Sequence, residues 1–233
     1  MAERPVFIPK SQGNLLVETK LVSFQWHAGM SASQKKKSIV SLHESAKEQL
    51  GLKNILEIST KSEDLLGQSL SAFNLMYTSP KTGSQYPLES IFQASKVFEK
   101  GGPYADIRGM SPRDAKQDPR LKESGRLVSF TSAGETWPLE PLTAFYDWLY
   151  LNVLVSQSGL TSQLKQFQGF TDIEFNPKKS INCQAYSVAL YVALDARGLL
   201  SSALSSKDEF ISCIRLFDQG VTVEDTPVMG NLF

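Results

Sequence analysis

Apolar residues recur every three or four positions in several stretches of the chain, and this spacing predicts amphipathic helices. Over residues 33–50 the apolar face consists of Ile39, Leu42, Ala46 and Leu50, and Gly51 supplies a helix stop. Residues 181–200 show a similar pattern. Residues 142–155 are apolar almost throughout and rich in aromatic side chains, which is typical of a core helix rather than of a cofactor site.

Other stretches are short, rich in β-branched and aromatic residues, and bounded by turn residues, which predicts strands. These are residues 14–26, 54–58 and 170–175, with a hairpin that pairs residues 75–78 with 85–86. Residues 4–13 contain prolines and are expected to form an extended arm. Residues 101–126 read as a long functional loop that carries a short helix over 112–116, and residues 226–233 as an exposed segment.

One further helix is predicted to begin at Pro87 and to end before the Gly101-Gly102-Pro103 sequence. Within it, Glu89, Gln93 and Lys96 are separated by four and three residues, so a helix places an acid, an amide and a base on one face. Such a face can bind and process a substrate. A solvated charged stripe on a surface helix would have the same spacing, and both interpretations stay open.

Composition narrows the possible chemistry. The 233 residues include 24 basic and 24 acidic ones, so no overall positive field recruits nucleic acid, and such contact would need a local patch. The run of lysines at 35–37 is either a solvated face or such a contact. With two cysteines, no CxxC and two histidines, we expect no zinc site, no disulfide framework and no cofactor. Residues 1–20 contain no run apolar enough for a signal peptide or membrane span, so we expect a cytoplasmic protein with no membrane partner.

Several short motifs follow one another in a specific order. They are Ile55-Leu56-Glu57-Ile58-Ser59, Leu70-Ser71-Ala72-Phe73, the Tyr86-Pro87 pair with Glu89 and Phe92-Gln93-Ala94-x-Lys96, Ser111-Pro112-x-x-Ala115, and Trp137. This order resembles the NADAR superfamily, which includes the YbiA-type N-glycosidases. The segments QWHAG at 25–29, FYDWLY at 145–150 and DIEFNPKKSINCQA at 172–185 make the whole chain similar to the NADAR antitoxins that accompany DarT toxins.

The resemblance implies a function. It implies an antitoxin that removes the ADP-ribose placed by a DarT-type toxin on guanosine in DNA. The partners would be ADP-ribosylated, single-stranded DNA, ADP-ribose as product, and the toxin. With the periodicity, it also implies an α+β fold: one mostly helical unit with a small β-sheet, in which residues 54–233 form the catalytic domain and 1–53 an extension packed on it. The YbiA-type acidic Trp-Gly motif is missing, so a second catalytic acid is unassigned.

Roles follow for single residues. Cleavage of an N-glycosidic bond needs an acid–base group, for which we predict Glu89. Lys96 is either an amine nucleophile that forms a Schiff base with an opened ribose, or an ion-pair or phosphate contact. Ser59, Lys61, Ser71, Asn74 and Arg108 are predicted to contact the hydroxyls and phosphates, Tyr86, Tyr104 and Trp137 to stack on the bases, and Gln93 and Asp172 to complete the substrate contacts.

Two other functions remain open at this point. One is an N-glycosidase that acts on a phosphoribosylamino pyrimidine of the riboflavin pathway, against which the missing Trp-Gly motif and the first fifty residues argue. The other is an antitoxin that binds ADP-ribose or the toxin without catalysis.

Overall fold

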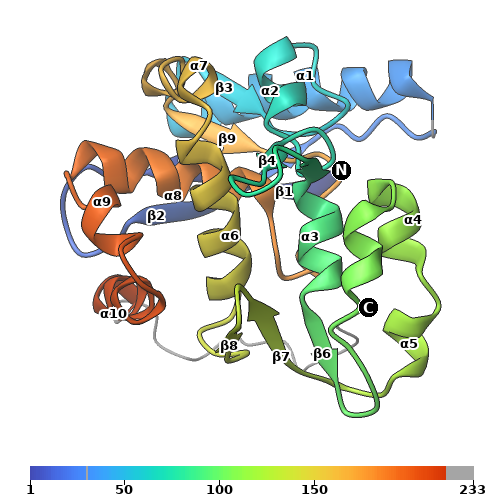
Figure 1. The fold of residues 1–233 in the computed structure, drawn as a ribbon. Coiled ribbons are helices and arrows are strands. Elements are labelled where there is room, and N and C mark those ends of the chain that lie inside the picture. Colours follow the sequence, from blue (N-terminus) through green and yellow to red (C-terminus); the bar gives the residue numbers. More distant parts are fainter. Residues whose placement is uncertain (30, 219–233) are drawn as a thin grey trace.

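A mixed β-sheet with strand order β2-β1-β9-β3 forms the centre of the protein in a computed structural model, which describes residues 1–29 and 31–218 (Figure 1). The segment 226–233, expected to be exposed, lies outside these residues. β1 (Ala2–Pro9) and β2 (Val17–Phe24) pair antiparallel along their whole length. β9 (Gly169–Thr171) joins β1 through Phe7 and Phe170, and runs parallel to β3 (Ile55–Glu57). The predicted extended arm is therefore wrong in part, because residues 2–9 form a paired strand.

Helix α1 (Ala32–Leu50) covers one face of this sheet. Its buried residues Ile39, Leu42 and Ala46 pack against Val6, Val22, Phe24 and Ile173. Ser31 caps its first turn through a bond from the Gln34 amide, and Gly51 ends it in the left-handed conformation with φ of 69°. The helix predicted for residues 33–50 is confirmed.

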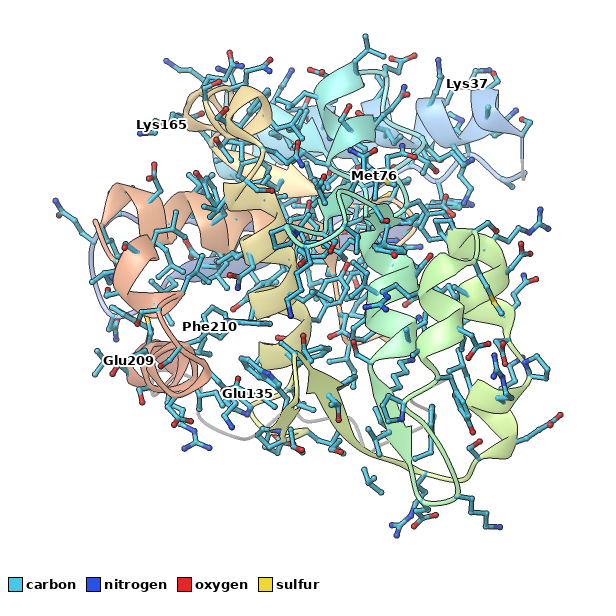
Figure 2. The ribbon with its side chains drawn as sticks, viewed as in Figure 1. Lys37, Met76, Glu135, Lys165, Glu209 and Phe210 are labelled. Atoms are coloured by element: carbon cyan, nitrogen blue, oxygen red, sulfur yellow. The ribbon has the colours of Figure 1, made fainter. Side chains whose placement is uncertain are left out.

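The opposite face carries the main core, built from α3 (Leu88–Ala94), α6 (Ala144–Val155) and α8 (Gln184–Ala196). The aromatic helix α6 is a core element as predicted, since Phe145 and Tyr150 are buried. The predicted helix over 181–200 is shorter and is followed by α9 (Leu200–Ala203) and α10 (Lys207–Asp218). Phe210 extends from α10 toward α6 and is fully buried (Figure 2).

A smaller lobe consists of a second sheet, with order β6-β7-β8, and the helices beside it. Its strands are β6 (Lys96–Phe98), β7 (Leu127–Ser132) and β8 (Glu135–Trp137). The predicted functional loop contains η1 (Ala105–Gly109), α4 (Pro112–Gln117) and α5 (Arg120–Glu123), so the short helix at 112–116 is confirmed. Its buried residues Phe98, Ile107, Ala115 and Leu121 form a core of their own with Leu127 and Ala94.

The remaining elements are short. β4 (Met76–Thr78) and β5 (Gln85–Pro87) form the predicted hairpin, and α2 (Leu65–Ser69) precedes it. α7 (Ser158–Thr161) and η2 (Leu164–Gln166) lead into β9. The fold is α+β, as predicted. No helix in the described part of the chain is long and apolar enough to cross a membrane.

The central helix differs from its prediction. α3 ends at Ala94, and Lys96 is the first residue of β6, where it pairs with Phe130. The Ser95 carbonyl accepts a hydrogen bond from the Thr131 amide, which belongs to the neighbouring strand. The β-branched and aromatic side chains of Val97 and Phe98 suit a strand, and pairing with β7 overrides the helical pattern. The prediction that Lys96 lies on the same helix as Glu89 is wrong.

Candidate active site

Glu89 lies in the first turn of α3, where the helix N-terminus favours a carboxylate. Only 6% of its surface is exposed. Its Oε1 accepts a hydrogen bond of 2.9 Å from Nε2 of Gln93 and lies 3.6 Å from Nζ of Lys116. Its backbone amide donates to the carbonyl of Ala72, which fixes the start of the helix against the preceding segment. The carboxylate is therefore held between an amide and a cation.

Lys96 reaches the same place from the strand that follows. Its Nζ lies 5.2 Å from the centre of the Phe92 ring. Burial lowers the pKa of the Lys96 ammonium to about 8; the charge of Glu89 opposes this shift, and that of Lys116 adds to it. Glu89 and Gln93 thus meet through the predicted helical spacing, whereas Lys96 comes within reach of the Glu89 charge from β6.

This arrangement joins an amine that is partly neutral near pH 8 to a carboxylate that can carry a proton. A neutral amine is a nucleophile for an electrophilic carbon, and a carboxylate can move a proton to a departing group. Oε1 of Gln93 is buried and has no hydrogen-bond partner among the described residues, which leaves an acceptor in the site for a substrate donor.

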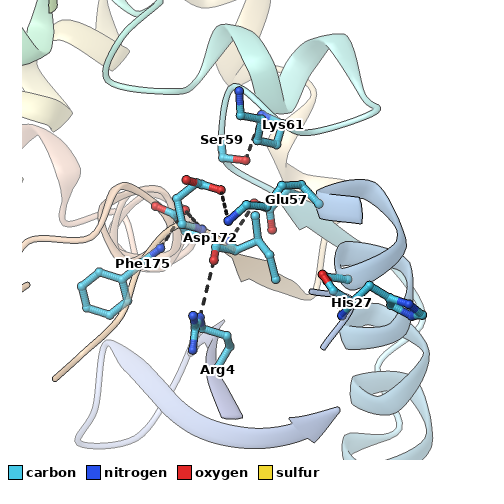
Figure 3. Close-up of polar contacts among 11 residues, drawn as sticks. Arg4, His27, Glu57, Ser59, Lys61, Asp172 and Phe175 are labelled. Atoms are coloured by element: carbon cyan, nitrogen blue, oxygen red, sulfur yellow. Dashed lines mark hydrogen bonds and ion pairs between the residues drawn. The ribbon is translucent and has the colours of Figure 1, made fainter. Parts of the chain in front are cut away.

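A second polar cluster lies at the ends of β3 and β9 (Figure 3). Oε2 of Glu57 accepts from the Thr171 hydroxyl, which is 2.9 Å from Nε2 of His43, and Oε1 accepts from the Ile173 amide. Burial raises the pKa of Glu57 and raises that of Asp172 to about 8, and the charge of Glu57 adds to the shift of Asp172. Asp172 accepts from the amides of Glu174 and Phe175 and from Gln184, so it fixes the loop after β9.

Gln184 connects the two clusters. Its Nε2 donates to Oδ2 of Asp172 and to the carbonyl of Ile58, and its Oε1 accepts from the amide of Ala72. The carbonyl of Ala72 accepts the amide of Glu89. A continuous chain of hydrogen bonds therefore runs from the end of β9 to the first turn of α3.

Comparison with known proteins decides which family carries this site. A family model described as the DarT1-associated NADAR antitoxin matches residues 2–222. The chain belongs to this NADAR family. Membership supports an antitoxin role in a DarT system and suggests a DarT-type toxin as partner. A search of curated proteins gave no match.

In this NADAR family member, some of the other predicted substrate contacts lie near the two clusters. Ser59 is buried and accepts from the amide of Lys61, and both lie beside Glu57 in Figure 3. Ser71 precedes Ala72, and its buried hydroxyl has no partner among the described residues. Their roles in binding stay predictions.

The remaining predicted contacts engage partners other than Glu89 and Lys96. Arg108 covers the Tyr86 ring at 5.1 Å, so these two residues engage each other at the surface near the start of α3. Asn74 is exposed and donates to the carbonyl of Gln68. The Tyr104 ring is covered by Arg120 at 4.6 Å, and its hydroxyl bonds to Ser124, within the smaller lobe.

The placement predicted for Trp137 is wrong. Trp137 is the last residue of β8 rather than part of a free loop, and none of its surface is exposed. Its ring packs 4.8 Å from that of Trp148 and 5.5 Å from that of Phe145. With no free face, the indole cannot stack on a base of the substrate. The cause is the packing of β8 against the aromatic side chains of α6, which the local sequence does not show.

Sequence reasoning missed two residues beside Glu89. Lys116 was within a predicted helix, but nothing in its spacing linked it to Glu89. Tyr146 belongs to the apolar helix α6, where the sequence pattern predicts that an aromatic side chain packs in the core. Burial raises the pKa of its phenol well above the usual value, and the charge of Glu89 adds to the shift. A cavity of about 40 Å³ lies beside Tyr146 and also contacts Thr143 and Asn182.

An open groove of about 620 Å³ follows α1 and lies outside the candidate site. The charges of Lys36 and Lys37 in its wall are balanced by those of Glu44 and Glu63. Lys36 pairs with Glu63 and Lys35 with Glu174, which favours a solvated face for the lysine run, whose Lys37 is labelled in Figure 2. Within the part of the chain that the structure describes, no group of His, Cys, Asp and Glu residues is arranged to hold a metal ion.

Proposed function

We propose that this protein is a glycohydrolase that removes ADP-ribose from guanosine in DNA and thereby acts as the antitoxin of a DarT-type toxin. The observation that carries the proposal is the placement of the Lys96 amine, with its pKa lowered to about 8, beside the buried carboxylate of Glu89. The family supplies the antitoxin context.

In the first step, neutral Lys96 attacks the anomeric carbon of the ribose, and the bond from this carbon to the guanine nitrogen breaks. One proton of the attacking amine passes through Glu89 to the departing nitrogen, so the base leaves neutral. The charge of Glu89 acts on the Lys96 ammonium, which supports a shared role for the two groups in this transfer.

In the second step, the bond between the anomeric carbon and the ribose ring oxygen breaks. The proton that remains on the Lys96 nitrogen moves to this oxygen, which leaves a Schiff base on an opened ribose. Water then hydrolyses the Schiff base, releases ADP-ribose and restores the free amine. In the competing assignment, Glu89 activates a water molecule directly, and Lys96 acts as its ion-pair partner or binds phosphate.

The test uses an oligonucleotide that carries ADP-ribosylated guanosine, incubated with the wild-type protein, Glu89→Gln and Lys96→Ala, and followed by mass spectrometry of the DNA. We expect the wild type to remove the ADP-ribose mass and both variants to lose the activity by at least about 100-fold. Lys122→Ala is the control, because this lysine is an exposed residue of α5 and is not one of the residues proposed to bind or process the substrate.

The outcomes separate the alternatives. An unchanged oligonucleotide with tight binding of ADP-ribose would indicate the non-catalytic antitoxin. Inactivity on DNA together with cleavage of a phosphoribosylamino pyrimidine would indicate the small-molecule glycosidase. Borohydride treatment during turnover distinguishes the two roles of Lys96, because only a Schiff base yields a protein adduct that Lys96→Ala abolishes.

A further inference from the structure

The hydroxyl of Tyr146 is a polar group that the mechanism above does not use. Tyr146 is in the first turn of α6, and only 5% of its surface is exposed. Its ring meets the Phe92 ring edge-on, with 5.0 Å between the ring centres. Phe92 is the residue that Lys96 covers with its ammonium group. Tyr146 and the proposed nucleophile Lys96 therefore contact the same aromatic ring, that of Phe92.

This hydroxyl is free to meet a ligand. Within residues 1–29 and 31–218 it makes no hydrogen bond. Tyr146 also borders the cavity of about 40 Å³. A phenol in an otherwise apolar helix usually has a partner when buried, which makes an unpaired one notable.

The neighbouring Tyr150 shows the contrast. Tyr150 is one helical turn further along α6 and is fully buried. Its hydroxyl donates to the carbonyl of Leu70, so its polar atom has a structural role. The two tyrosines lie on the same helix and in the same core. Among the described residues the hydroxyl of Tyr150 has a hydrogen-bond partner and that of Tyr146 has none, so the Tyr146 hydroxyl can bind a ligand.

The phenol keeps its proton and can therefore donate a hydrogen bond. Burial and the charge of Glu89 both disfavour its ionised form, so it keeps its proton over the working range of pH. A protonated phenol that shares the Phe92 ring with Lys96 and senses the charge of Glu89 suits an acceptor oxygen of the substrate. During the proposed reaction, the ribose ring oxygen is the one that gains negative charge as its bond to the anomeric carbon breaks.

We propose that Tyr146 is a third catalytic residue, whose hydroxyl donates a hydrogen bond to the ribose ring oxygen as the ring opens beside Lys96. The proton stays on the phenol; the ring oxygen takes its own proton from the nitrogen of Lys96. This inference rests on the proposed function for its substrate. It assigns α6 a direct part in the chemistry, in addition to its role in the core.

The experiment compares Tyr146→Phe with the matched variant Tyr150→Phe in two assays. The first is turnover of the ADP-ribosylated oligonucleotide. The second is borohydride trapping of free ADP-ribose on the protein, which reports ring opening at Lys96 and does not need a DNA substrate. Lys96→Ala is the blank for trapping, and thermal unfolding is measured for every variant.

We expect Tyr146→Phe to lower kcat by roughly 100-fold, as for loss of a donor to a developing oxyanion, and to slow trapping, with KM and Tm little changed. Tm is unaffected because no hydrogen bond to another described residue is lost. Tyr150→Phe should do the reverse: it lowers Tm and leaves kcat and trapping unchanged.

Wild-type rates of turnover and trapping in Tyr146→Phe would overturn the inference and leave the proposed function in place. A wild-type protein that traps ADP-ribose but does not cleave the oligonucleotide would overturn the proposed function, and slowed trapping in Tyr146→Phe would still support the inference. If the wild type neither cleaves nor traps, both are overturned.

Discussion

At the scale of single residues, the surroundings of Lys96 decide what its side chain can do. A lysine in water is almost wholly protonated at neutral pH and is a poor nucleophile. Burial against Phe92 makes the ammonium less stable, and Glu89 restores part of that stability. The resulting pKa of about 8 leaves a usable fraction of neutral amine near neutral pH.

This pKa makes a prediction about pH. Below pH 8 the neutral fraction of Lys96 rises about tenfold with each pH unit, and above pH 8 it levels off. The rate of ADP-ribose trapping should therefore rise from pH 6 and reach a plateau above about 8. The rate of adduct formation is measured by intact mass after borohydride treatment. It is compared with the rate for Nα-acetyl-lysine, whose side-chain amine is free, under the same conditions.

Lys116→Ala provides the control for the cause of the shift. The charge of Lys116 lowers the pKa of Lys96, so its removal should move the midpoint to higher pH. A trapping rate that keeps rising to the pH of an ordinary lysine would show that Lys96 is not perturbed and would count against its role as nucleophile.

At the scale of elements, the short helix α2 holds the loop that follows β3. Gly67 of α2 is buried so tightly that an added Cβ would collide with the carbonyl of Glu57 and approach Oγ of Ser62 to 2.5 Å. The helix can come this close to the strand end only without a side chain at this position. The position of the Ser59–Lys61 turn therefore depends on Gly67.

Gly67→Ala should destabilise the protein by about 2 kcal/mol, because the overlap with fixed backbone outweighs the gain of up to about 1 kcal/mol in helix propensity. Urea unfolding measures this. Gly159→Ala in α7 is the matched control, since no atom lies within 4 Å of the added Cβ, and it should be neutral or slightly stabilising. Equal stability of the two variants would contradict the predicted collision.

At the scale of the whole molecule, Arg197 connects the end of α8 with the turn between β1 and β2. Its guanidinium donates hydrogen bonds to four carbonyl oxygens of this turn, those of Lys10, Gln12, Gly13 and Leu15. Residues 1–24 thus share a sheet with β9 and are also fastened to the helix that follows it. Whether residue 53 marks a domain boundary stays a prediction.

Arg197→Ala should lower the free energy of unfolding by about 3 kcal/mol, since several charge-assisted hydrogen bonds are lost together. Arg197→Lys should recover less than half, because an ammonium cannot form the fork that a guanidinium does. Thermal and urea unfolding measure both, with exposed Arg215→Ala in α10 as control. A destabilisation by Arg215→Ala as large as that by Arg197→Ala would argue against the connection.

The sequence by itself determined the elements whose pattern is local. The helix over 33–50 with its Gly51 stop, the 75–86 hairpin and the helix at 112–116 were predictable, because capping, turn and periodicity signals lie within each segment. The order of short motifs was likewise enough to indicate the family, and it brought Glu89 and Lys96 forward as the proposed reactive pair.

Only the tertiary structure decided the rest. Pairing of β6 with β7, some thirty residues away, ended α3 before Lys96, because these hydrogen bonds outweigh local preference. Packing of β8 against Phe145 and Trp148 of α6 buried Trp137. Burial, which no local pattern specifies, set the pKa of Lys96 and left the hydroxyl of Tyr146 without a hydrogen-bond partner among the described residues. The sequence is enough to propose the reactive residues, but their protonation and their neighbours arise from the packing of the chain.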